Sequence, residues 1–326
     1  MLTHTWLRIP VLFTVIIFSC TDVCAWGFFA HQRINRLAVF CLPPEMMILY
    51  KPQLEYITAH ATDPDKRRYA VAAEGARHYI DIDLFDKPPY AQIPRNWTDA
   101  VAKYSADTLN RNGILPWHLE KMMAMLTTAF REKDQQRILR LSAELGHYIA
   151  DAHVPLHVCS NHNGQFTGQQ GIHGLWESRI PELLADKTFD YWAGKAVYIS
   201  EPRKYIWDII RVSGMAADTV LAYEKRLSEK FPPGRRYGYE NRNGVLIRTY
   251  AEDYTKAYAL SMGDMVERRM KNAIAAVAAA WYTAWVNAGQ PSLQELNHTV
   301  LTPEEVQEME LLQRQWLEGK LPVREE

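Results

Sequence analysis

The sequence carries almost no net charge, because its 37 lysine and arginine residues are balanced by 38 aspartate and glutamate residues. Proteins that hold duplex nucleic acid by counterion release need an excess of basic residues, and this chain has none. Cysteine is also scarce, with four in 326 residues, and two of them, Cys41 and Cys159, lie beyond residue 25. This pair can form a disulfide in an oxidising compartment or remain as buried thiols, and the sequence leaves both open.

The N-terminal apolar run, residues 9–18, is too short for a transmembrane helix, which needs about 20 residues. It follows Arg8 and precedes small residues at positions 23–25 of the kind that a signal peptidase recognises. We therefore expect a signal peptide over residues 1–25 and a secreted or periplasmic mature chain that starts at Trp26. An interfacial anchor and a lipoprotein cleaved before Cys20 are the alternatives.

Strand-like alternation of apolar and polar residues is rare. Apolar residues instead recur at helical spacing in most segments, which are residues 31–42, 116–132, 134–154, 174–186, 201–230 and 250–288. The segments 84–98, 160–172 and 231–245 are rich in proline or glycine and are expected to be loops, too short to be domain linkers. We predict an all-α fold with one multi-helix domain over residues 26–290 and a charged tail over residues 291–326.

Two histidine–carboxylate pairs are the most informative residues. His147 and Asp151 are four positions apart in a predicted helix, so both side chains leave the same face. His173 and Glu177 repeat this spacing, and His157 lies just after a proline that ends the first helix. Imidazoles and carboxylates arranged in this way are typical ligands of zinc.

Further candidate ligands lie upstream. Cleavage before Trp26 would free an α-amino group with a pKa of ~7.7–8, low enough for a metal ion to displace its proton. The amine and carbonyl of this residue can chelate a cation that His31 also reaches. Asp63 and Asp65 offer carboxylates, and His78 follows them in the sequence.

In their order, these groups resemble the zinc-dependent phospholipase C and S-one/P-one nuclease superfamily. The shared pattern is a mature N-terminal Trp, an early His, an Asp followed by a His, then His-x3-Asp-x5-His and finally His-x3-Glu. It extends from Trp26 to about Leu184. Members of the superfamily are secreted all-α enzymes with three zinc ions in a cleft, so the resemblance implies this fold and this cofactor.

The resemblance also implies ligands and roles. The first zinc would take Asp63, His78, His147 and one oxygen of Asp151. The second would take His157, His173 and Glu177. The third would take the Trp26 amine and carbonyl, His31 and the other oxygen of Asp151. Asp65 is the alternative to Asp63, while Asp63 and Asp151 are the expected catalytic carboxylates.

Three dications facing three carboxylates would leave the cleft positive and suited to a phosphate ester. A zinc-bound hydroxide, available because zinc lowers the pKa of bound water to ~7, would attack phosphorus in line. The sequence has no Gly-x-Ser-x-Gly motif that would indicate a serine nucleophile instead. Lys66, Arg67 or Arg68 could neutralise a phosphate oxygen, or could form only a solvated basic run.

The sequence indicates the substrate less directly than it indicates the metal and the reaction. Three features are similar to the nuclease branch: the short spacing from Trp26 to His31, the segment from His173 to Glu177, and the segment His78-Tyr79-Ile80-Asp81. This resemblance implies that Tyr79 stacks on a base and that Asp81 hydrogen-bonds to the edge of that base. Glu177 agrees instead with phospholipase C, and Lys66 replaces an arginine of the nucleases, which weakens bidentate phosphate contact.

We therefore expect a single-strand-specific endonuclease or 3′-nucleotidase that acts on single-stranded nucleic acid or nucleotides. The alternatives are a phospholipase C that acts on phosphatidylcholine-type lipids and a zinc-binding helical protein without turnover. No stable protein partner is implied.

Overall fold

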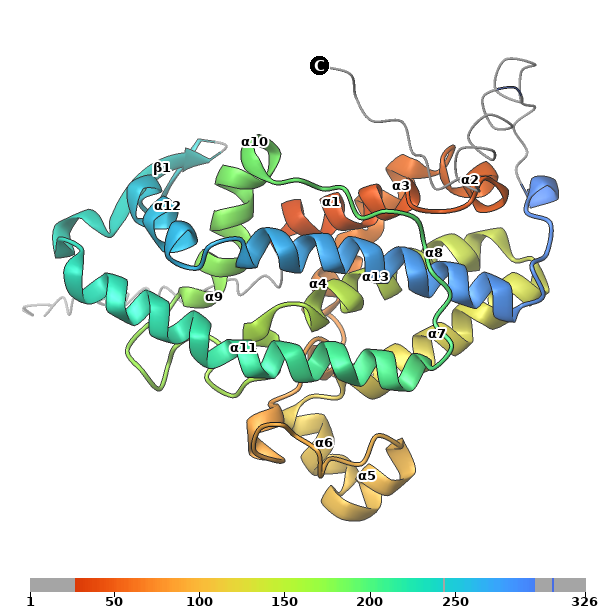
Figure 1. The fold of residues 1–326 in the computed structure, drawn as a ribbon, viewed down its shortest axis with the longest axis horizontal. Coiled ribbons are helices and arrows are strands. Elements are labelled where there is room, and N and C mark those ends of the chain that lie inside the picture. Colours follow the sequence, from red (N-terminus) through yellow and green to blue (C-terminus); the bar gives the residue numbers. More distant parts are fainter. Residues whose placement is uncertain (1–26, 243, 297–306, 308–326) are drawn as a thin grey trace, which may run out of the picture.

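The computed structural model describes residues 27–242, 244–296 and 307. Helices make up most of this part of the chain (Figure 1), which confirms the predicted all-α class. The expected signal peptide, Trp26 and most of the expected C-terminal tail lie outside the described residues.

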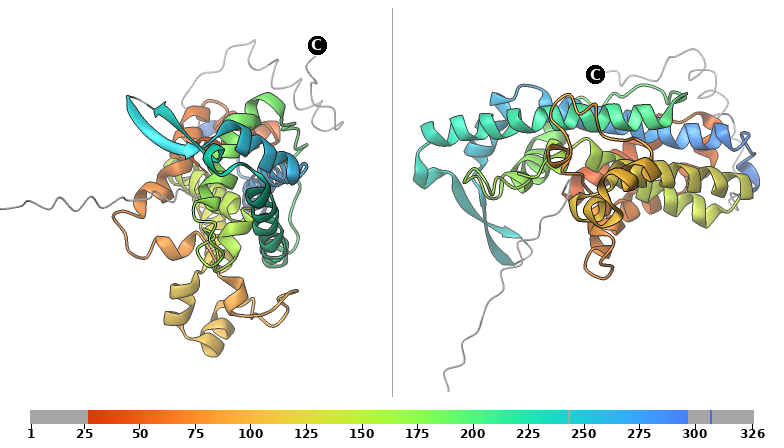
Figure 2. Two further views of the ribbon diagram at one scale, coloured as in Figure 1. Left: turned by 90° about the vertical axis from the view of Figure 1, so that its left-hand side faces the viewer. Right: turned by 90° about the horizontal axis from the view of Figure 1, so that it is seen from below.

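Long helices form the core of the described part. They are α1 (Phe28–Val39), α7 (Leu115–Glu132), α8 (Gln135–Ala152), α11 (Pro202–Lys230) and α13 (Met265–Asn287). Helix α8 contacts α1, α7 and α13, and the long helices run side by side in two orthogonal views (Figures 1 and 2). Nearly every residue from Ala273 to Trp281 is buried, as expected for a helix surrounded by the core. None of the described helices is long and apolar enough to cross a membrane.

Shorter helices connect the long ones. The α-helices among them are α2 (Pro44–Tyr50), α3 (Leu54–Ala59), α4 (Asp63–Arg67), α5 (Trp97–Tyr104), α6 (Ala106–Asn112), α9 (Ile172–Gly174), α10 (Asp186–Thr188) and α12 (Glu252–Ser261). Single 3₁₀ turns cover His60–Thr62, Gly75–Arg77, Ile82–Leu84, Pro155–Val158, Pro233–Arg235 and Gln294–Leu296. Several of these short elements carry the polar residues that the sequence singles out, so the long helices act as their support.

Two predicted helices differ in detail from those observed. The segment 250–288 is divided into α12 and α13, because Gly263 has a φ of 63°, which a helix cannot continue through. The segment 174–186 is helical, but Leu175–Arg179 and Pro181–Ala185 form π-helical turns. Pro181 has no N–H to donate, and a wider turn accommodates this loss.

The expected loop over residues 231–245 is wrong in its second half. Tyr237–Arg242 and Val245–Tyr250 form strands β1 and β2 of an antiparallel hairpin, with Tyr237 opposite Tyr250 and Arg242 opposite Val245. The turn contains Gly244 at a φ of 83°, and the sequence there is Asn-Gly, a strong signal for a hairpin. The other glycine residues and the proline residues of the segment 231–245 also fit a loop, which is why the sequence pattern predicts one.

Cys41 and Cys159 are both buried and are not joined in a disulfide. Burial raises the pKa of each thiol, to about 12 for Cys41. The structure therefore favours the second of the two alternatives, buried and unreactive thiols.

Candidate metal centre

Three groups of buried histidines and carboxylates lie where the short elements meet α8. The groups are His78, His147 and Asp151; His157, His173 and Glu177; and His31, Asp65 and His147. Within each group, the potential ligand atoms lie within 4.8 Å of one another. The structure thus brings together eight side chains from α1, α4, α8 and three connecting segments, although they span almost 150 positions of the sequence.

The first group is built around Asp151 on α8. One carboxylate oxygen, Oδ2, lies 2.9 Å from Nδ1 of His78 and 3.3 Å from Nε2 of His147. The two histidine nitrogens are 3.1 Å apart. The helical spacing of four that the sequence shows is what aligns His147 with Asp151, and His78 reaches them from the loop after Gly75–Arg77.

In the second group the common atom is Oε2 of Glu177. It lies 3.3 Å from Nε2 of His157 and 3.0 Å from Nε2 of His173. His157 lies in the 3₁₀ turn that Pro155 begins, and His173 and Glu177 lie on α9 and the π-helical turn after it.

The third group lies beside the other oxygen of Asp151. Its Oδ1 lies 3.4 Å from Nε2 of His31 on α1, whose ring stacks on that of His147 with centroids 3.8 Å apart. Asp151 therefore directs its two oxygens at different histidines, which is the geometry of a carboxylate shared between two sites. Trp26, the further ligand expected here, lies outside the described residues.

The histidines are held in one tautomer by the backbone. Nδ1–H of His147 donates to the carbonyl of Ala61 at 2.8 Å, and Nδ1–H of His157 donates to that of His78 at 2.7 Å. His173 makes the same contact with the carbonyl of His162 at 3.0 Å. Each of these three rings consequently turns an unprotonated Nε2 toward its group, as metal-ligating histidines do.

Unpaired buried atoms test whether the residues fit metal ions. Folded proteins leave few buried polar atoms without a hydrogen bond. Atoms that lack one here include both ring nitrogens of His31, Oδ2 of Asp65, Oδ1 of Asp151, Nε2 of His173 and Oε1 of Glu177. Their concentration in the three groups fits cations as the missing partners, and the nitrogen and oxygen donor set suits zinc.

Two of the histidines are already in the form that binds a metal at neutral pH. Burial lowers the pKa of His31 to about 4, helped by the nearby His147, and burial lowers that of His173 to about 4. Both rings are therefore neutral near pH 7. Burial raises the pKa of Glu177 to about 8, and a cation in the second group would lower it again. Burial would also raise the pKa of Asp151, yet its interactions with the surrounding histidines, His147 foremost, hold it well below its usual range.

Asp65, and not Asp63, is the carboxylate that the structure brings to the centre. Oδ1 of Asp65 is 3.8 Å from Nδ1 of His78 and 3.8 Å from Nε2 of His147. The side chain of Asp63 is one-third exposed and contacts His60 and Lys66 instead. Residues two apart on a helix point in nearly opposite directions, so α4 can direct only one of the two inward. The geometry therefore favours Asp65, the alternative, over Asp63.

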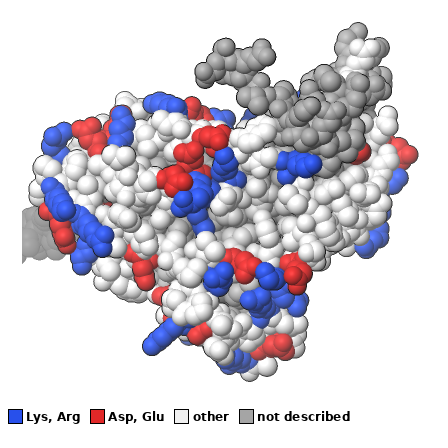
Figure 3. Space-filling model, in the orientation of Figure 1, with Lys and Arg blue, Asp and Glu red and all other residues white. Residues whose placement is uncertain are grey.

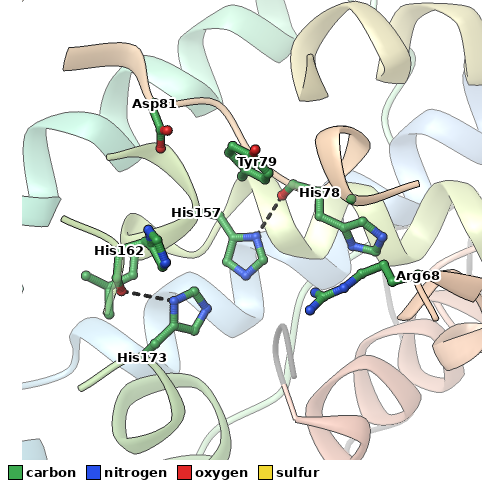
Figure 4. Close-up of a pocket in the computed structure, with 9 residues that line it drawn as sticks. Arg68, His78, Tyr79, Asp81, His157, His162 and His173 are labelled. Atoms are coloured by element: carbon green, nitrogen blue, oxygen red, sulfur yellow. Dashed lines mark hydrogen bonds between the residues drawn. The ribbon is translucent and has the colours of Figure 1, made fainter. Parts of the chain in front are cut away.

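A cavity of about 340 Å³ opens onto the first and second groups (Figure 4). Tyr79 and Asp81 lie on one side of it, and the guanidinium of Arg68 points toward the histidine rings. Burial, aided by repulsion from Asp83, raises the pKa of Asp81 to about 7. Lys66, expected to contact substrate, does not line the cavity, and its ammonium lies 3.0 Å from a carboxylate oxygen of Asp63.

Glu74 is a residue of the centre that the sequence did not single out. It is fully buried, and its Oε1 lies 3.7 Å from Nε2 of His78, on the side of the ring away from the first group. Arg67 and Arg77 contact its other oxygen, Oε2, at 2.9 and 2.7 Å, and the Tyr148 hydroxyl donates to Oε1. Burial would raise the pKa of Glu74, but these contacts hold it well below its usual range. The spacing of four between Glu74 and His78 was the available signal.

Acidic and basic side chains are intermixed over the face shown in Figure 3. At the centre itself, bound cations and Arg68 would attract an anionic substrate. Comparisons of the chain with family models, with curated proteins and with solved structures found no match.

Proposed function

We propose that the chain is a zinc-dependent phosphodiesterase with the fold of the phospholipase C and S-one/P-one nuclease superfamily, and that it hydrolyses single-stranded nucleic acid or 3′-nucleotides. The observation that carries this proposal is the set of three buried histidine–carboxylate groups. The two oxygens of Asp151 face His31 of one group and His78 and His147 of another, and a cavity opens onto the first and second groups.

In this proposal Asp65 replaces Asp63 in the ligand set. Asp65, His78, His147 and Oδ2 of Asp151 would hold the first zinc. His157, His173 and Glu177 would hold the second. His31, Oδ1 of Asp151 and the N-terminal residue Trp26 would hold the third. When bound, zinc supplies Lewis-acid activation of water and of the phosphate oxygens.

Arg68 takes the role that Lys66 was expected to have. If Asp65 is the ligand, the basic residue three positions later is Arg68. This chain then has an arginine at the position where the nuclease branch has one. Its guanidinium lines the cavity and would pair with two oxygens of a phosphate, a contact that lysine cannot make.

Tyr79 and Asp81 would bind the base next to the cleaved bond. The Tyr79 hydroxyl donates to the carbonyl of Arg111 at 3.1 Å, which holds the ring at the cavity wall. A base can stack on such a ring, and the carboxyl of Asp81 can hydrogen-bond to its polar edge. With a pKa of about 7, Asp81 can accept or donate at neutral pH.

A phospholipase C is the second candidate, and Glu177 favours it because that branch has glutamate at this position. The two functions separate in an assay of the same preparation on single-stranded DNA, 3′-AMP and phosphatidylcholine. We expect hydrolysis of the first two, whereas hydrolysis of phosphatidylcholine alone would contradict the nuclease assignment.

The requirement for zinc is tested with His147→Ala, which should remove both bound zinc and hydrolysis. His60→Ala is the matched control, because His60 lies outside the three groups and is partly exposed. Undiminished hydrolysis by His147→Ala would overturn the zinc mechanism. Zinc binding by the unsubstituted protein without hydrolysis of any phosphate ester would indicate the zinc-binding protein without turnover.

A further inference from the structure

The cavity beside the candidate metal centre has a polar lining residue to which the proposed function gives no role. Among the described residues that line it, Gly75 and Leu156 have no polar side chain, and the ligand and substrate-binding assignments include all the others except His162. Figure 4 shows the His162 ring beside His173, on the side of the cavity opposite Arg68. His162 is exposed and not packed in the core, so its ring can contact a bound substrate.

The loop that carries His162 is fixed by hydrogen bonds between its backbone and polar side chains. At its start, the N–H of Ser160 donates to the carboxylate of Asp83 at 2.8 Å. Toward its end, the N–H of Gly171 donates to Oδ1 of Asn163 at 2.9 Å. These contacts hold both ends of the loop, so His162 has a defined place in the cavity.

Gln165 determines which nitrogen of the His162 ring carries the proton. Nε2 of Gln165 donates to the carbonyl of Ser160 at 2.7 Å, and its Oε1 accepts from the N–H of Asn163 at 2.9 Å. These two contacts fix the orientation of the amide. Nε2 of Gln165 also lies 3.4 Å from Nδ1 of His162. An amide nitrogen only donates, so Nδ1 of His162 is the acceptor and the proton of the ring is on Nε2.

His162 therefore has the opposite tautomer from the histidines next to it. His157 and His173 donate from Nδ1–H to backbone carbonyls and keep an unprotonated Nε2 for a metal ion. The Nε2–H of His162 is a hydrogen-bond donor instead. Fixed donors of this kind stabilise negative charge that develops on an oxygen in the transition state, because they need no reorientation during the reaction.

We propose that His162 is a catalytic residue that donates a hydrogen bond from Nε2–H to an oxygen of the phosphate group bound in the cavity, and that Gln165 is the positioning residue that fixes its tautomer. The inference rests on the proposed function, because it takes the bound group to be a phosphate. The proton stays on His162 throughout. Arg68 and His162 then contact the phosphate from opposite sides of the cavity.

The test measures binding of inorganic phosphate without turnover. The protein is expressed as the full chain, purified in its processed form, loaded with zinc and titrated with phosphate in a calorimeter. His162→Ala should weaken phosphate binding by about tenfold or more, as expected for loss of a hydrogen bond to a charged group. His162→Gln retains a donor near the same place and should stay within about threefold. Phe166→Ala is the matched control, because Phe166 is in the same loop, is 72% exposed and does not line the cavity.

The tautomer is measured separately, by nitrogen–proton correlation spectra of the imidazoles in the metal-free protein. His162 should show the Nε2–H form, whereas His157 and His173 should show the Nδ1–H form. Gln165→Leu should give His162 a mixture of both forms. In that background His162→Ala should weaken phosphate binding less than it does alone, because the two residues act as a unit.

Hydrolysis gives a third measurement. On any phosphate ester that the unsubstituted protein cleaves, His162→Ala should lower kcat by about 10–100-fold, and His162→Gln should restore most of the loss. Zinc content and the unfolding temperature should be the same in all variants, which excludes misfolding and loss of the metal as causes.

Several outcomes would overturn the proposal. They are failure of the unsubstituted zinc-loaded protein to bind phosphate, equal phosphate affinity in His162→Ala, and an Nδ1–H form of His162. Loss of zinc from His162→Ala would make this residue a metal ligand and would overturn the proposal too. The proposed function fails in a different way. Absence of hydrolysis of every phosphate ester would contradict it, while weaker phosphate binding by His162→Ala would still support the contact between His162 and phosphate.

Discussion

Exchanging Asp65 and Asp63 separately for asparagine tests the corrected ligand set. Asn has the shape of Asp but no charge, so each substitution removes one carboxylate with little change in volume. Asp65 is 3% exposed and lies among the centre's histidines, whereas the side chain of Asp63 is 34% exposed and contacts Lys66 at 3.0 Å. The two positions are thus a matched pair on one short helix, with one carboxylate directed inward and the other outward.

The expected effects differ in size. Loss of a group that only orients a metal ligand lowers affinity by 10–100-fold, so loss of a ligand should lower zinc affinity by at least ~100-fold, or about 2.7 kcal/mol. The exposed ion pair of Asp63 contributes about 0–1 kcal/mol, which corresponds to at most a fivefold change. Competition calorimetry with a zinc chelator measures both affinities, and far-ultraviolet circular dichroism of the metal-free proteins verifies that both fold.

The assignment of Asp65 would be refuted if Asp63→Asn lost zinc while Asp65→Asn retained it. Equal and small losses in the two variants would also contradict it, because the first group would then hold zinc without either carboxylate.

Three further outcomes follow from the structure. Tyr79→Ala should slow hydrolysis of single-stranded DNA and 3′-AMP by roughly tenfold, since a stacked base contributes ~1–3 kcal/mol, and an equal loss on phosphatidylcholine would contradict base stacking. Glu74→Gln should lower zinc affinity by about 10–100-fold because the ring of His78 loses its charged partner, and unchanged affinity in calorimetry would show that Glu74 only packs. Burial lowers the pKa of His118 to about 3, so the unfolded chain binds this proton below about pH 6.5 while the native state does not. Acidification from pH 6.5 to 4 therefore costs the metal-free protein up to ~1.4 kcal/mol per pH unit at this site, and His118→Phe should show a shallower decline in unfolding free energy, whereas identical slopes would count against it.

The helices and the paired ligands could be predicted because the signals are local. The spacing of four in His147 and Asp151 places both on one face of a helix whatever the rest of the chain does. The choice between Asp63 and Asp65 could not be made in this way, because it depends on how α4 is rotated against α8. That rotation is set by packing between segments distant in the sequence, which periodicity does not describe.

The hairpin and Glu74 show the same limit in different ways. Asn243-Gly244 was a local signal for a hairpin, but the glycines and prolines around it also fit a loop, and pairing of β1 with β2 decided between them. Glu74 has the right spacing from His78, yet only the fold reveals that Arg67 and Arg77 converge on it. Its role depends on burial, which a spacing of four does not predict.

Anomalous X-ray scattering at the zinc edge, from crystals of the processed protein grown with zinc, tests the metal centre most directly. We predict three peaks: one between Asp65, His78, His147 and Asp151, one between His157, His173 and Glu177, and one beside His31 and the second oxygen of Asp151. A crystal that contained zinc elsewhere but no peak at the first two groups would contradict the account.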